Sequence, residues 1–182
     1  MALWVFGYGS LLWNPGFTPA EAVPARLTGY HRSFCMLSIH HRGSEEEPGL
    51  VLALDKTEGA ACDGVAFRVA DAEEAPVLAM LRERELVSSA YLESEVELAL
   101  EDGRRLNSLA YIIDPGHCQY CQFDLETQAQ MIARSTGGRG PNDEYLFNTA
   151  AHLEKMGIED AEMRWLVARV RDLKATPCAA ER

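Results

Sequence analysis

The order of hydrophobic patterns along the chain constrains its fold more than any other feature. The first half holds short apolar runs separated by Gly and Pro, whereas from Asp124 onward the apolar residues recur at helical spacing. Short strands at nearly regular spacing are typical of an antiparallel sheet that curls towards a barrel. We therefore expect an α+β fold, a mixed or antiparallel β-barrel with flanking and C-terminal helices.

Local patterns indicate where the elements of this fold lie. Residues 25–37 read as one strand or a pair of strands around Gly29, and the two runs near Glu101-Asp102-Gly103 form a candidate hairpin. Asn142 is a plausible N-cap for its helix. The expected strands cover residues 3–6, 25–37, 50–54, 64–70, 95–98 and 106–113, and the expected helices cover 71–86, 125–134, 142–157 and 159–173. We expect one domain over residues 1–174 and a flexible tail over 175–182.

Charge and hydropathy exclude several classes of partner. The 182 residues carry a net charge of −11, which disfavours nucleic acids and anionic membranes as partners. No apolar run approaches the roughly 20 residues that span a bilayer. The N-terminal apolar stretch has neither a basic segment before it nor a small-residue cleavage site, so it does not resemble a signal peptide. These features predict a cytoplasmic protein; they leave the oligomeric state open.

The cysteines and histidines do not predict a disulfide framework or a metal site. The odd count and scattered spacing of the cysteines fit free thiols in a reducing compartment. A zinc site would need a second pair beside Cys118 and Cys121, so that pair is read as thiols on a surface loop. His40 and His41 are neighbours that would point to opposite faces of a strand. The five cysteines are Cys35, Cys62, Cys118, Cys121 and Cys178.

A glutamate near the end of the helix expected over residues 71–86 is the first candidate for chemistry. Leu78, Leu81 and Glu85 fall on one helical stripe, whereas Glu83 points to nearly the opposite side. A carboxylate that faces a core is desolvated, so we expect its pKa to rise. Glu85 is therefore a candidate general base or acid near neutral pH, although a glutamate paired with an arginine at a helix end would show the same pattern.

Three further features are candidates for ligand binding. Gly7-Tyr8-Gly9-Ser10 follows an apolar strand, and its two glycines allow φ values that would aim consecutive N–H groups at one point. Such a turn could hold a carboxylate or stabilise an oxyanion. Arg42 is a candidate clamp for a carboxylate. Tyr145, in the first turn of a helix after a glycine-rich loop, could reach a ligand, although a core aromatic is the commoner explanation.

Taken together and in this order, these segments strongly resemble the ChaC family of glutathione-specific γ-glutamylcyclotransferases. The resemblance extends over about residues 3–173. The bacterial form is the most similar, since residues 81–91 align without a gap onto its catalytic segment, although Ser88-Ser89 replace a glycine that the family often has there. The motifs are Val5-Phe6-Gly7-Tyr8-Gly9-Ser10-Leu11-Leu12-Trp13, His41-Arg42-Gly43, Pro48-Gly49, Arg84-Glu85 and Asn142-x-Glu144-Tyr145-Leu146.

The resemblance implies a γ-glutamylcyclotransferase-like fold and a reaction without a metal or organic cofactor. The α-amine of glutathione would attack its own γ-carbonyl and release 5-oxoproline and Cys-Gly. Glu85 would be the catalytic proton carrier, and Tyr145 would contact the substrate. The substrate loop would comprise Val5, Phe6, Gly7, Tyr8, Gly9, Ser10 and Leu11.

Other functions stay open at the level of the sequence. The same chemistry could act on other γ-glutamyl peptides or amines. A catalytically silent regulatory protein linked to cation transport is a second possibility, and Glu85 argues against it. A small anion- or nucleotide-binding module is a third, but the chain lacks a phosphate-loop lysine and Rossmann-type glycine spacing.

Overall fold

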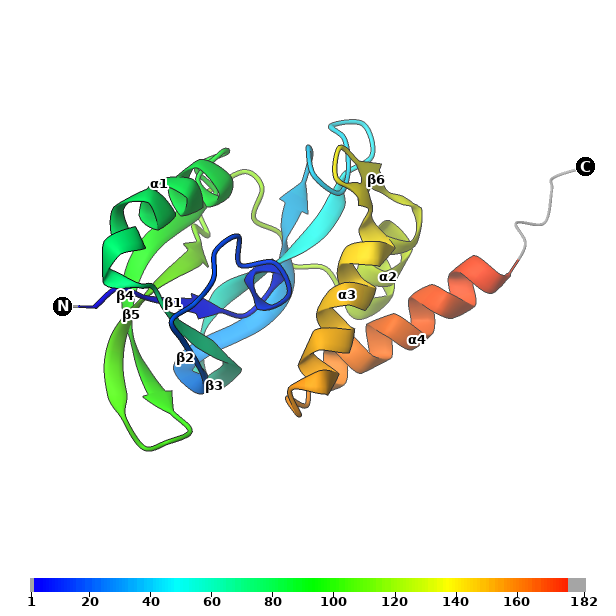
Figure 1. Ribbon diagram of the computed structural model, residues 1–182. Coiled ribbons are helices and arrows are strands. Elements are labelled where there is room, and N and C mark those ends of the chain that lie inside the picture. Colours follow the sequence, from blue (N-terminus) through cyan, green and yellow to red (C-terminus); the bar gives the residue numbers. More distant parts are fainter. Residues whose placement is uncertain (1, 177–182) are drawn as a thin grey trace, which may run out of the picture. The chain divides into compact units, whose positions relative to one another are not determined.

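The computed structural model describes residues 2–176 and divides the chain into two compact units (Figure 1). Among the described residues, the first unit comprises 2–36 and 52–120, and the second comprises 37–51 and 121–176. The expectation of one domain over 1–174 stays a prediction. Most of the expected tail, residues 177–182, lies outside the described residues. No helix within residues 2–176 has the length and apolar character that crossing a membrane requires.

Five strands form a closed barrel, in the order β1-β3-β2-β4-β5. Strand β1 pairs antiparallel with β3 and parallel with β5, so the barrel is mixed. Together with four α-helices it confirms the expected α+β class. The strands are β1 (Trp4–Gly7), β2 (Glu21–Ser38), β3 (Gly49–Arg68), β4 (Tyr91–Leu100) and β5 (Arg105–Ile113).

Two of the strands are much longer than the hydrophobic pattern indicated. The separate strands expected over 50–54 and 64–70 are wrong, because β3 runs through both without a break. Likewise, 25–37 belongs to the single strand β2. The middle of β3 has exposed, polar side chains, so its extended form depends on pairing within the barrel rather than on apolar alternation. Gly29 and Gly59 have φ of +86° and +77°, which a glycine adopts without strain.

The predicted hairpin is confirmed. Strands β4 and β5 pair antiparallel, with Leu98 opposite Leu106, and residues 101–104 make the turn. Val96, Leu98 and Leu100 alternate along β4 and are all buried. Period-two alternation and an Asp-Gly turn are local signals, which explains why the sequence reveals this hairpin.

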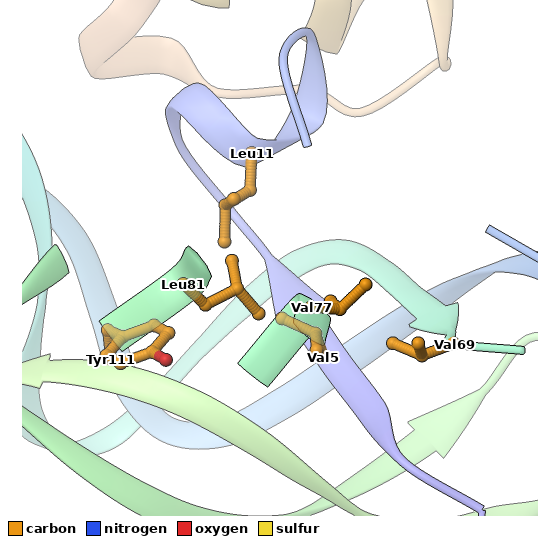
Figure 2. Packing of buried hydrophobic residues seen from close by; sticks show 6 residues of the cluster. All are labelled: Val5, Leu11, Val69, Val77, Leu81 and Tyr111. Atoms are coloured by element: carbon orange, nitrogen blue, oxygen red, sulfur yellow. The ribbon is translucent and has the colours of Figure 1, made fainter. Parts of the chain in front are cut away.

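Helix α1 (Glu74–Glu85) covers part of the barrel in the first unit. A 3₁₀ turn, η2 (Asp71–Glu73), precedes it, and the Asp71 carboxylate pairs with Arg68 at 3.0 Å rather than capping the helix. Figure 2 shows Val77 and Leu81 of α1 packed with residues of β1 and β5. The labelled core residues are Val5, Leu11, Val69, Val77, Leu81 and Tyr111.

The second unit is mainly helical, as predicted, and its three helices pack pairwise. Asp124 and Asp160 cap α2 and α4 by accepting hydrogen bonds from the amides of Thr127 (2.7 Å) and Met163 (3.0 Å). A short hairpin, β6 (Thr136–Gly137) and β7 (Gly140–Pro141), connects α2 to α3. The helices are α2 (Leu125–Arg134), α3 (Asn142–Lys155) and α4 (Ala161–Ala175).

Candidate active site

Glu85 is the last residue of α1, and its side chain is largely buried. Only 14% of the side chain is exposed, and the Nε atom of Arg84 lies 3.0 Å from Oε1 of the carboxylate. Glu83, two residues earlier, is exposed. The helical phase therefore placed these two glutamates correctly. The catalytic role of Glu85 and the expected rise of its pKa stay predictions.

Arg84 connects this carboxylate to the segment that follows β1. Its Nη2 donates to Oγ of Ser10 at 2.9 Å, and its Nη1 donates to the carbonyl of Asn14 at 2.6 Å. The guanidinium is planar, so its hydrogen bonds to Ser10 and Asn14 fix its orientation beside the Glu85 carboxylate, with which it forms an ion pair. Glu85 and Ser10, far apart in sequence, thus share one cation. Sequence reasoning used Arg84 only to select Glu85 and missed this link.

The Gly7–Ser10 turn lies at the end of β1, and the expectation that its glycines let consecutive N–H groups aim at one point stays a prediction. Neither Gly7 nor Gly9 has a positive φ. Space explains Gly7 instead, because a Cβ there would lie 2.6 Å from Cε2 of Phe67. The Tyr8 hydroxyl donates to the carbonyl of Tyr111 at 2.7 Å, which anchors the middle of the turn to β5.

The side chains of the apolar residues in the expected substrate loop belong to the core. Val5 and Phe6 are fully buried, and Leu11 packs in the same cluster as Val5 (Figure 2). These three residues can therefore meet a ligand only through backbone atoms. The binding role of residues 5–11 stays a prediction, and it now refers to the backbone and to Tyr8 and Ser10.

Tyr111 is a candidate that the sequence did not reveal. Burial raises the pKa of its phenol, and the nearby negative charges of Glu93 and Glu85 raise the pKa further. Its hydroxyl donates to Oε2 of Glu93 at 3.4 Å. The phenol therefore stays protonated at physiological pH, with its hydroxyl directed at Glu93 and within electrostatic reach of Glu85. A tyrosine in an apolar strand resembles any core aromatic, so no local signal distinguished it.

Arg42 and Tyr145 lie together in the second unit. The Arg42 guanidinium is 5.8 Å from the centroid of the Tyr145 ring. Its Nη1 donates to the carbonyl of Pro141 at 3.1 Å and lies 3.4 Å from Oε1 of Glu144. Both Arg42 and Tyr145 are buried. These contacts stabilise the start of α3, and a direct role of either residue towards a substrate stays a prediction.

Asn142 is not the N-cap of α3, contrary to expectation. Pro141 occupies that position, and Asn142 is the first helical residue. Its side-chain amide instead bonds both backbone groups of Leu50. The glycines of the neighbouring motifs also serve close packing. A Cβ on Gly49 would lie 2.2 Å from the carbonyl oxygen of Arg42, and one on Gly137 would lie 2.5 Å from the amide of Gly43.

The cysteine pair is only partly a surface feature. Cys118 is an exposed free thiol, as expected, but Cys121 is buried, and burial raises the pKa of its thiol to about 11. His40 and His41 contribute backbone carbonyls that accept hydrogen bonds from Gly138 and Arg139. Within residues 2–176, no group of three or more His, Cys, Asp or Glu side chains could hold a metal ion.

The fold and the site define a class of protein: a mixed barrel in which a glycine turn and a largely buried carboxylate are bound to the same arginine. The profile described as ChaC-like protein matches residues 3–173, and the chain therefore belongs to the ChaC family. This confirms the resemblance that the motifs indicated.

Most of the chain is similar in sequence to proteins named as γ-glutamylcyclotransferases. It is 38% identical over 175 residues to the glutathione-specific γ-glutamylcyclotransferase of Escherichia coli K12, covering 95% of this chain and 74% of that protein. It is 32% identical over 183 residues to the glutathione-specific γ-glutamylcyclotransferase of Schizosaccharomyces pombe, covering 89% and 88%.

The fold is also found among solved structures. The crystal structure of a glutathione-specific γ-glutamyl cyclotransferase from yeast superposes with a TM-score of 0.86, at 24% identity, and covers 96% of this chain and 97% of that one. A further structure, of a γ-glutamyl cyclotransferase, has a TM-score of 0.59 at 17% identity and covers 96% and 98%. These likenesses confirm the γ-glutamylcyclotransferase-like fold.

Proposed function

We propose that this chain is a glutathione-specific γ-glutamylcyclotransferase, a lyase that releases 5-oxoproline and Cys-Gly. The observation that carries the proposal is the link through Arg84, which binds both the Glu85 carboxylate and Ser10 of the glycine turn. This link brings the Glu85 carboxylate close to the glycine turn, which supports a shared role of the two in catalysis. The curated relatives that carry this activity span nearly the whole chain.

The reaction needs little beyond a folded substrate and a proton carrier. The α-amino nitrogen of the γ-glutamyl group attacks the γ-carbonyl carbon, and a five-membered ring forms. The bond from that carbon to the cysteine nitrogen then breaks. Because the nucleophile is tethered to its target, the enzyme gains most from holding the substrate in the cyclising conformation.

Glu85 is the residue that we assign to proton transfer. The substrate amine is an ammonium at neutral pH and cannot attack until it loses a proton. Glu85 would accept that proton and deliver one to the departing cysteine nitrogen, so that no net proton is consumed by the carboxylate. The Arg84 guanidinium would hold the carboxylate in one orientation throughout the cycle.

The turn is assigned to recognition of the glutamyl group. Backbone N–H groups of residues 8–10 would hold this part of the substrate and stabilise the oxyanion that forms at the γ-carbonyl. The phenol of Tyr111 donates to Glu93 and lies within electrostatic reach of Glu85. Tyr145 and Arg42 stay candidate substrate contacts on the basis of the family resemblance.

Glutathione is the substrate that the relatives favour. The matching proteins of E. coli and S. pombe are named as glutathione-specific. Other γ-glutamyl peptides or amines would use the same chemistry at the glutamyl end, so they are alternative outcomes of the assay. Nothing in the comparisons favours a silent regulatory protein. A cytoplasmic location accords with this substrate, since glutathione keeps thiols reduced there.

The test is release of 5-oxoproline from glutathione, followed by mass spectrometry, for the wild type, Glu85→Gln and Glu83→Gln. Glutamine keeps the shape of glutamate but cannot carry the proton. We expect the Glu85 variant to lose activity and the exposed Glu83 variant to retain it. Activity of Glu85→Gln near that of the wild type would refute the assignment. An inactive wild type that turns over other γ-glutamyl compounds would refute glutathione specificity.

A further inference from the structure

A buried arginine, Arg32, contacts the Gly7–Ser10 turn. Arg32, on β2, is only 6% exposed. Its Nη1 donates to the carbonyl of Asp63 at 2.7 Å and to the carbonyl of Tyr8 at 3.3 Å, and it lies 3.6 Å from Sγ of Cys62. Burying a guanidinium is costly unless its N–H groups are satisfied, so these contacts hold it in place. The reaction proposed above does not use this residue.

The contact with Tyr8 determines the direction of one peptide group. The peptide between Tyr8 and Gly9 is trans, since the described chain contains no cis bonds. In a trans peptide the C=O and the following N–H point in opposite directions. When the Tyr8 carbonyl faces Arg32, the Gly9 N–H must therefore face away from it. A charged donor on the carbonyl also polarises the peptide and strengthens the N–H as a donor.

We propose that Arg32 is a positioning residue that orients the Tyr8–Gly9 peptide, so that the Gly9 N–H is presented to the glutamyl group of the substrate. The proposal rests on the proposed function for its substrate and on the contacts of Arg32 for its geometry. Arg32 acts through the turn and does not touch the substrate itself. Two anchors then hold Tyr8: its hydroxyl binds the Tyr111 carbonyl, and its carbonyl binds Arg32.

A neighbouring arginine supplies a matched control. Arg26 lies on the same strand and meets the same residue, Asp63, through a two-pronged pair with the carboxylate at 2.7 and 2.8 Å. That pair is exposed and uses the Asp63 side chain, whereas Arg32 binds the Asp63 carbonyl and the Tyr8 carbonyl. Arg26→Met therefore removes a β2 guanidinium bound to Asp63 without altering the turn.

The experiment combines kinetics with amide hydrogen exchange in Arg32→Met, Arg32→Lys and Arg26→Met. Loss of one oriented donor that holds substrate and transition state equally raises KM by about tenfold, for a hydrogen bond of ordinary strength. It leaves kcat nearly unchanged. Exchange should quicken at Leu12 and Asn14, whose amides donate to the carbonyls of Gly9 and Ser10. The amides of the β4–β5 hairpin are the internal reference.

The outcomes separate this proposal from the proposed function. We expect Arg32→Met to raise KM and exchange at the turn, Arg32→Lys to recover part of both, and Arg26→Met to change neither. Unchanged exchange at the turn, or an equal effect of Arg26→Met, would overturn the role of Arg32. If Arg32→Met does not fold, the Lys variant decides by the same two readouts. If the wild type releases no 5-oxoproline, the proposed function fails, and the exchange data alone decide whether Arg32 orients the turn.

Discussion

Asn142 holds Leu50 by both backbone groups: its Oδ1 accepts from the Leu50 amide at 2.8 Å, and its Nδ2 donates to the Leu50 carbonyl at 2.8 Å. The side chain is fully buried. The asparagine amide bonds both backbone groups of Leu50 as a neighbouring backbone peptide would. This relationship explains why an asparagine opens α3 without capping it.

Replacing Asn142 should destabilise the protein. Asn142→Ala leaves a buried N–H and a buried C=O without partners, at about 1–3 kcal/mol each, so we expect the free energy of unfolding to fall by about 2–6 kcal/mol. Urea unfolding followed by circular dichroism measures this change. Asn148→Ala, at an exposed position of the same helix, is the control and should have little effect. Equal unfolding midpoints for the two variants would contradict the inference.

The forked arrangement of N–H donors on the Arg84 guanidinium, here called the fork, should matter more for activity than the positive charge of this residue. The substitution Arg84→Lys keeps the positive charge, but a lysine ammonium cannot reach the Glu85 carboxylate, Ser10 and Asn14 together. We expect kcat/KM for glutathione to fall by about 100-fold, the effect of misplacing a catalytic group by about 1 Å. Arg82→Lys, which alters an exposed pair with Glu93, is the matched control. Wild-type kcat/KM in Arg84→Lys would show that geometry at Glu85 does not depend on the fork.

The two thiols of the Cys-x-x-Cys segment should differ in reactivity. The thiolate is the reactive form, and burial raises the pKa of Cys121 to about 11 from an ordinary 9.0. At pH 8 we expect iodoacetamide to modify Cys118 readily and Cys121 hardly at all. Peptide mass spectrometry of the folded protein reads out both sites, and the unfolded protein, in which both should react, is the control. Equal labelling in the folded state would contradict the burial of Cys121.

An ion pair between α2 and α4 should make the second unit sensitive to acid. Hydrogen bonds from Arg169 and Gln130 lower the pKa of Glu126 to about 2 from an ordinary 4.5. Because the folded pKa is the lower one, the pair stabilises the fold above about pH 4.5, and this contribution is lost as the pH falls towards 2. The effect is small, since both side chains are partly exposed.

The Glu126–Arg169 pair is tested with the variant Glu126→Gln. Glu154→Gln, at an exposed position of α3, is the control. Thermal unfolding at pH 7 and pH 3 should show a smaller loss of stability on acidification for Glu126→Gln than for the wild type. Glu154→Gln should follow the wild type at both pH values. An identical pH dependence in all three proteins would show that the pair contributes nothing measurable.

Local signals in the sequence were enough for the elements that depend on near neighbours. The β4–β5 hairpin has strict alternation and an Asp-Gly turn, and α2 begins at an aspartate cap, so both follow from a few adjacent residues. Helical phase likewise placed Glu85 inward and Glu83 outward. The motif order pointed to the ChaC family, because those short segments recur together. None of these inferences needed a contact between distant residues.

The tertiary structure alone decided the roles of groups whose partners lie far along the chain. The polar middle of β3 is a strand because barrel pairing satisfies its backbone, and Gly7 is a glycine because Phe67 fills its space. Asn142, Arg84 and Arg32 have ordinary surroundings in sequence, yet each bonds a backbone or side-chain group brought near by folding. Hydrogen bonds act over about 3 Å in space, so a pattern of neighbours in sequence cannot identify such partners.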